Sequence, residues 1–155
     1  MSKSLNRVRA ALEDADLPVD IREVDVARTA QDAAASVGCH IDQIVKSIIF
    51  QVADREEVVL FLTAGGNQVE ARKASACAGA PLGKADAGLI RQQTGFAIGG
   101  VAPIGHLNPI RAWMDPKLLE FDSLWAAAGT PRHLFAVDPA ILMKISHAQV
   151  YEFTS

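Results

Sequence analysis

The sequence lacks the features that mark a disulfide-bonded, metal-binding or membrane-spanning protein. Its two cysteines, Cys39 and Cys77, lie far apart and form no C-x-x-C pair, which argues against a disulfide framework and a zinc ribbon. No spacing of metal-ligating residues is present, and no run of about 18 apolar residues occurs. The N-terminus has no apolar signal segment. We therefore expect a soluble protein of the reducing cytoplasm, with no metal and no membrane partner.

Several common catalytic motifs are also missing. The chain contains no H-E-x-x-H, no G-x-S-x-G and no G-x-G-x-x-G. The segment Gly79–Lys84 is similar to a phosphate-binding loop, but its glycine spacing is one residue short, and Ala85 replaces the Ser or Thr that would bind magnesium. These absences argue against zinc-protease, serine-hydrolase, dinucleotide and nucleoside-triphosphatase chemistry. No cofactor is expected.

Length and composition predict one domain, residues 1–155. The chain has 155 residues, of which 50% are hydrophobic and 21% charged, so it can bury a core of ordinary size. A formal net charge of -3 argues against a protein that coats nucleic acid. It leaves room for a local basic patch that meets one end of an RNA.

Periodicity and turn residues predict a mixture of helices and strands. Pro18 stops the first helix, Thr29 opens the second with a capping-box-like start, and Gly38 closes it. We expect helices over 5–17, 29–38, 70–78, 85–93 and 139–145, and strands over 19–26, 44–52, 58–63, 110–114, 124–128, 133–137 and 149–153. This order predicts an α/β (α+β) fold with a mixed central sheet flanked by helices.

Lys46 is the first candidate functional residue. Strand alternation puts it on the same face as Ile44 and Ile48, where a charged amine needs a partner or a cavity. Burial without a partner would lower its pKa. The alternative is a lysine near the strand's start whose stem packs while its ammonium reaches water.

The second candidate is the glycine-rich segment Ile98–His106. Four glycines and two prolines within residues 95–109 are too many for a regular element. Such a loop can offer unhindered amides that stabilise a developing oxyanion or hold a phosphate oxygen. The alternative is a tight connection between a helix and a strand. His106 could donate a hydrogen bond or move a proton, although a lone histidine is more often structural.

Two segments resemble the signatures of a known family. Ile44–Phe50 and Gly99–Gly105 are similar, in order and separation, to those of the YbaK and prolyl-tRNA synthetase insertion-domain family. Thr29–Gly38 looks like the family's helix before the lysine strand, and Asp115–Pro116 like its turn after a later strand. The resemblance covers most of the chain and implies the YbaK-like fold.

The resemblance also implies a function and a set of site residues. Members hydrolyse the ester of mischarged tRNA, commonly tRNA for proline that carries alanine, cysteine or 2-aminobutyrate. It implies catalytic roles for Lys46 and for the loop residues Gly99, Gly100 and Val101. It implies substrate binding by Ser47, Ala102, Pro103, Ile104, Gly105 and His106. The G-x-x-x-P pattern falls on Gly99 and Pro103.

The expected partner is mischarged tRNA. Prolyl-tRNA synthetase is a second candidate partner, which could supply part of the tRNA contact. We expect local basic groups to contact tRNA, with Arg72, Lys73, Lys84 and Arg111 as the candidates, although each is also compatible with plain surface charge. Two alternatives stay open at this point: a non-catalytic aminoacyl-tRNA-binding module or synthetase adaptor, and a hydrolase of unrelated small esters.

Overall fold

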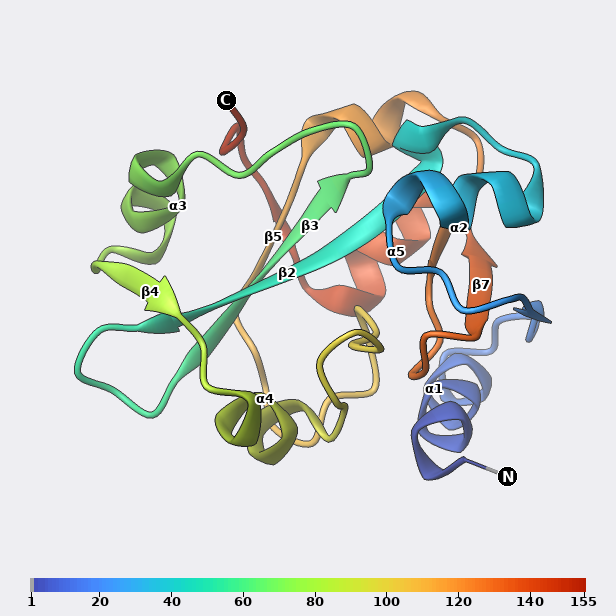
Figure 1. Ribbon diagram of the computed structural model, residues 1–155, viewed down its shortest axis with the longest axis horizontal. Helices are drawn as coiled ribbons and strands as arrows, with labels where there is room; N and C mark the ends of the chain where they lie inside the picture. The colour runs from blue at the N-terminus through green and yellow to red at the C-terminus, as the bar shows by residue number, and fades with distance from the viewer. Residues whose placement is uncertain (1) are drawn as a thin grey trace.

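Eight strands within residues 2–155, the part of the chain that this computed structural model describes, form one mixed sheet (Figure 1). The strand order is β1-β7-β6-β2-β3-β5-β8, and β4 pairs with β2 beside this path. Pairs β2/β6, β3/β5 and β5/β8 are parallel, and the others antiparallel. The strands are β1 Ile21–Glu23, β2 Ile44–Val52, β3 Val58–Ala64, β4 Leu82–Lys84, β5 Ala112–Met114, β6 Leu124–Ala127, β7 His133–Val137 and β8 Gln149–Val150.

Helices cover both faces of the sheet, which confirms the predicted fold class. Alternate side chains of β3 enter different clusters: Leu60 and Leu62 pack with α1, α4 and α5, whereas Phe61 packs with α3. On the Phe61 side of the sheet, α2 covers the first residue of β2. The helices are α1 Lys3–Asp14, α2 Ala30–Val37, α3 Ala71–Ala78, α4 Ala87–Thr94 and α5 Pro139–Ser146, with 3₁₀ turns η1 Ile41–Gln43 and η2 Pro116–Glu120.

Local capping explains most helix ends. Thr29 Oγ1 accepts a hydrogen bond from Asp32 N, and Gly38 adopts the left-handed conformation that ends α2, both as predicted. Glu70 and Asp86 cap α3 and α4 in the same way, so α4 begins two residues later than predicted. The first helix ends at Asp14, before Leu17 and Pro18, because Asp16 is left-handed with φ 57°.

The hairpin of β2 and β3 and the strand at 133–137 are confirmed, but other predicted bounds are wrong. The strand predicted over 19–26 is three residues long, and the one over 149–153 is two. Leu82–Lys84, which lies outside every predicted strand, forms β4. The turns η1 and η2 were not predicted. These short elements depend on partners far away in the sequence, which local propensity does not register.

Candidate functional site

A cavity of about 540 Å³ lies beside the middle of β2. Its walls come from α2 and the segment before it, from β2, from the β4–α4 junction, from the glycine-rich loop and from the β6–β7 turn. The walls are mainly alanine, valine, leucine and isoleucine, with a few polar groups. Ligand sites of proteins commonly have this size and composition, with few polar groups fixing the orientation of the ligand.

The cavity follows an open edge of β2. The strand pairs with β3 along one edge, while on its other edge β6 pairs only with Ile44 and Val45, and β4 only from Phe50 onward. Among residues 2–155 no strand pairs with the other edge between these two. Since the lining includes residues from both faces of β2, the cavity wraps around this edge.

Main-chain groups of β2 face the cavity at this edge. Ser47 and Ile49 lie opposite Leu62 and Leu60, and both of these β3 residues bond instead to the residues that flank β5. In an antiparallel ladder, such positions direct their own N–H and C=O away from the partner strand. Ser47 and Ile49 therefore present donors and acceptors to the cavity, as a strand edge does to an added strand.

Lys46 lines the cavity from the face of β2 that α2 covers. Its half-buried ammonium donates a hydrogen bond to Asn67 O in the turn after β3. Burial lowers the pKa of Lys46 below its ordinary value, while the charges of Asp115 and Asp42 act in the opposite direction. The sequence placed this lysine correctly on the face of Ile44 and Ile48, and its partner is a main-chain carbonyl.

Ser47 projects to the opposite face of β2, with Val45 and Ile49. Its Oγ is buried, and within the described chain it has no hydrogen-bond partner. An unsatisfied buried hydroxyl costs about 1–3 kcal/mol, so a ligand group that bonded to it would recover that free energy. Ser47 lines the same cavity as Lys46.

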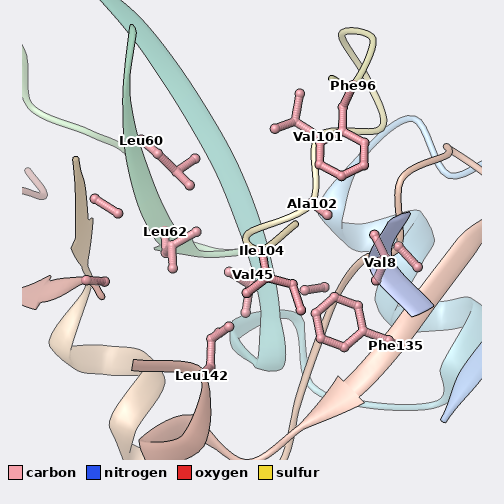
Figure 2. Close-up of a cluster of buried hydrophobic side chains, with 14 of the residues drawn as sticks. Val8, Val45, Leu60, Leu62, Phe96, Val101, Ala102, Ile104, Phe135 and Leu142 are labelled. Atoms are coloured by element: carbon pink, nitrogen blue, oxygen red, sulfur yellow. The ribbon is translucent and has the colours of Figure 1, made fainter. Parts of the chain in front are cut away.

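The glycine-rich loop closes the other side of the cavity. Both of its ends are tied to Thr94, because Phe96 N donates to Thr94 Oγ1 at 3.0 Å and Leu107 N to Thr94 O at 3.1 Å. Phe96, Val101 and Ile104 insert into the core (Figure 2). Each such side chain contributes about 1.5–3 kcal/mol by burial, which holds the loop in place.

The two adjacent glycines of this loop have different tasks. Gly99 lines the cavity with φ +89°, a conformation that other residues rarely adopt. Gly100 packs on the β6–β7 turn, where an added Cβ would lie 2.9 Å from Gly129 O and Thr130 Cα. The Gly100 amide already donates to Ala97 O at 3.1 Å, so Gly99 and Val101 remain the candidates for amide donors.

The other loop residues predicted as substrate-binding lie outside the cavity lining. Ala102, Pro103 and Ile104 are buried beneath it, and Gly105 packs on α1. His106 lies with Gly105 in a separate surface hollow along α1, where its Nε2 bonds to Ala102 O at 2.8 Å. Burial lowers the pKa of His106, and the Ala102 carbonyl partly opposes this. The structure therefore brings together Lys46, Ser47, Gly99 and Val101.

Sequence reasoning missed several residues at the cavity. Arg28 and Thr29 precede α2, and Thr130 lies in the β6–β7 turn. The cap at Thr29 was recognised, but nothing local indicated that Arg28 and Thr130 meet β2. Of the four basic residues expected to contact tRNA, Lys84 lines the cavity. The other three lie elsewhere: Arg72 on α3, Lys73 bonded to Thr154 O, and Arg111 paired with Glu57 at 2.9 Å.

Fold and site together define a small α/β protein with a cavity at the open edge of β2. A lysine and a glycine-rich loop line this cavity. A family model for the aminoacyl-tRNA editing domain matches residues 25–145. The chain therefore belongs to the aminoacyl-tRNA editing domain family, and the predicted family is confirmed. This membership gives it a role in tRNA editing at the level of the family.

Three individual proteins are similar to this chain over almost its full length. The chain is 40% identical to the solved structure of a proposed trans-editing enzyme for prolyl-tRNA synthetase, with a TM-score of 0.92 and coverage of 100% of this chain and 99% of that one. The hypothetical protein APE2540 shares the fold, with a TM-score of 0.86 at 23% identity over 96% of this chain and 99% of that one. The uncharacterised protein YwhH of Bacillus subtilis is 26% identical over 149 residues, 96% of this chain and 94% of YwhH.

The described residues, 2–155, lack two further features. No helix there has both the length and the apolar character needed to cross a bilayer. No group of three or more His, Cys, Asp or Glu side chains in this range is arranged to hold a metal ion.

Proposed function

We propose that this protein hydrolyses the ester bond of mischarged aminoacyl-tRNA, with tRNA for proline carrying a small amino acid as its substrate. The observation that carries the proposal is the cavity at the open edge of β2, which is lined by Lys46, Ser47 and Gly99. Membership in the editing-domain family and likeness to a proposed trans-editing enzyme support it.

The cavity favours catalysis by positioning. Among the described residues that line it, none is Asp, Glu, His or Cys, so no side chain is placed to act as an ordinary general base. In the proposed reaction a water oxygen attacks the carbonyl carbon of the ester. The bond between this acyl carbon and the ribose oxygen then breaks. The proton goes to the leaving ribose oxygen, with the adenosine's free hydroxyl assisting its transfer. The products are the free amino acid and uncharged tRNA.

Lys46 and the loop amides supply electrostatic stabilisation in this scheme. The ammonium holds the ester's oxygen or the phosphate of the terminal adenosine, and the amides of Gly99 and Val101 hold the aminoacyl group. Because Lys46 already has one carbonyl partner and an ammonium has three donor hydrogens, two remain for a substrate.

An editing site of this kind removes errors that a synthetase cannot avoid. A pocket built for proline rejects a smaller side chain weakly, since each missing methylene changes binding by only about 1–3 kcal/mol. The cavity here has apolar walls that include Val101, Ile49 and Ala33, which favour a small aliphatic side chain. The proposal requires that this second site discriminate against the larger proline ring.

The test is a deacylation panel with purified protein and prolyl-, alanyl-, cysteinyl- and 2-aminobutyryl-tRNA. We expect clearance of at least one small aminoacyl group while prolyl-tRNA is spared, because the proposed editing site discriminates against the proline ring. Cleavage of free aminoacyl esters as fast as of the tRNA substrates would favour a small-ester hydrolase. Binding without clearance across the panel would favour the non-catalytic binding module.

Arg28 and Lys84 are expected to contact phosphates at the 3′ end of the tRNA. Both are exposed and lie at the cavity, on segments far apart in the sequence. A lost phosphate contact lowers the slope of log affinity against log salt by about 0.7 for a single strand. Binding of tRNA by Arg28→Ala and by Lys84→Ala, measured across salt concentrations, should therefore be weaker and less steeply dependent on salt.

The matched control for this experiment is Arg72→Ala. Arg72 is also exposed but lies on α3 and does not line the cavity. It should leave affinity and slope unchanged. Equal losses in all three variants would mean that tRNA binding depends on overall charge and not on the cavity rim.

A further inference from the structure

The turn after β3 holds the hydrogen-bond partner of the Lys46 ammonium. This turn, Gly65–Asn67, joins β3 to the segment before α3, and its Asn67 O accepts the hydrogen bond from Lys46 Nζ. A lysine side chain has four rotatable bonds, and fixing it in one rotamer costs about 1.5–2 kcal/mol of conformational entropy. The position of its ammonium therefore depends on how firmly the turn is held.

Asp115 holds the turn from one side. The residue is 1% exposed and follows β5 directly. Oδ2 accepts hydrogen bonds from Ala64 N at 3.1 Å and Asn67 Nδ2 at 2.9 Å, and Oδ1 accepts one from Lys117 N at 2.9 Å. The buried charge is thus hydrogen-bonded to both ends of the 64–67 segment, including the residue whose carbonyl receives Lys46.

Asp42 holds the same turn from the other side. Its Oδ1 accepts a hydrogen bond from Gly66 N at 2.8 Å. The close approach requires glycine, because a Cβ on Gly66 would lie 2.6 Å from that oxygen, and one on Gly65 would lie 2.2 Å from Ile41 O. The turn is therefore clamped between two carboxylates that come from η1 and from the end of β5.

We propose that Asp115 and Asp42 are positioning residues for Lys46: by clamping the turn Gly65–Asn67 they fix the place of the ammonium in the cavity, with their carboxylates bonded to the same turn that accepts its hydrogen bond. The inference rests on the proposed function, in which Lys46 acts as a cation. Neither carboxylate lines the cavity, so each acts through the lysine and not on the substrate.

The charges around Lys46 support this division of tasks. Burial lowers the pKa of Lys46, and Asp115 first and Asp42 second raise it. Arg28 and Lys84 line the same cavity as like charges. The ring of His40 lies 3.9 Å from Asp42 Oδ2, and the ammonium of Lys117, beside Asp115, pairs with Glu120 at 3.1 Å. The two carboxylates are thus the groups that offset the cost of a half-buried ammonium.

The test measures the pKa of Lys46 directly, by NMR of protein labelled with ¹³C at the lysine ε carbons. The Lys46→Arg spectrum identifies the resonance. Asp42→Asn keeps an oxygen that can accept from Gly66 N while it removes the charge, and Asp115→Asn removes the larger contribution. Asp122→Asn, on an exposed carboxylate that does not contribute to the pKa of Lys46, is the matched control.

We expect the pKa of Lys46 to fall in Asp42→Asn and to fall further in Asp115→Asn, with no change in Asp122→Asn. If hydrolysis needs the protonated lysine, the alkaline limb of kcat/KM against pH moves to lower pH in the same order. A purely structural role would lower activity at every pH and leave the limb in place. If Asp115→Asn fails to fold, the pKa of Lys46 and the alkaline limb in Asp42→Asn alone decide whether the inference holds.

The outcomes separate this inference from the proposed function, because the titration needs no substrate. An unchanged pKa of Lys46 in folded Asp42→Asn and Asp115→Asn, in a protein that clears mischarged tRNA, overturns the inference and leaves the function standing. If the pKa of Lys46 falls in the two variants but the wild type clears no mischarged tRNA, the inference on Asp42 and Asp115 stands and the proposed hydrolysis is overturned.

Discussion

Replacement of Lys46 with alanine is expected to reduce deacylation by about 10²–10³-fold, the loss seen when one preorganised donor to a developing charge is removed. The proposed donor is a half-buried ammonium in an apolar cavity, where its interaction with a charged oxygen is stronger than in water. The measurement is single-turnover hydrolysis of the mischarged tRNA that the panel identifies.

Two further variants make this result interpretable. Lys46→Arg keeps the charge but presents a planar fork in place of a compact ammonium, so we expect partial activity at most. Lys144→Ala removes an exposed lysine on α5 and should leave turnover unchanged. Retention of full activity in folded Lys46→Ala would exclude the lysine from catalysis and leave the loop amides as the remaining candidates.

Replacement of Phe61 with alanine is expected to lower the free energy of unfolding by about 3–5 kcal/mol. Phe61 is fully buried at the centre of β3, stacked on Trp113 with ring centroids 5.1 Å apart and edge-on to Phe153 at 4.9 Å. Alanine would leave a cavity that these rings cannot fill without moving strands. Chemical denaturation followed by circular dichroism measures the loss.

Phe50 offers the matched comparison for this core position. It lies in β2, is half-buried, and contacts Phe61 edge-on at 5.7 Å. Phe50→Ala should cost distinctly less than Phe61→Ala, because part of its ring already meets water. Equal losses of stability in the two variants would contradict the prediction that the more buried ring at Phe61 contributes more to stability.

Much of the framework was predictable because its signals are local. The hairpin of β2 and β3 follows from two apolar runs around a polar turn, and α2 from the cap at Thr29 and the stop at Gly38. Alternation alone placed Lys46 on an apolar face that could not hold an unpaired charge. Family resemblance then connected this lysine with the loop near Gly99.

The composition of the site was less predictable. The sequence could not show that β6 and β4 share one edge of β2 and leave Ser47 and Ile49 open between them. Nor could it show that the Gly100 amide is used inside the loop, or that His106 lies in another hollow.

By itself, the sequence determined the longer helices and the central strands, which residue is an anomalous charge, and which loop is free of side-chain bulk. These are properties of periodicity, capping and residue type, and they extend over a few neighbouring residues. Only the tertiary structure decided that Asp42 and Asp115 bond to the turn that accepts the hydrogen bond of Lys46, and that Arg28 and Lys84 line one cavity. Such contacts join residues that are tens of positions apart, and their formation depends on how the whole sheet and its helices pack.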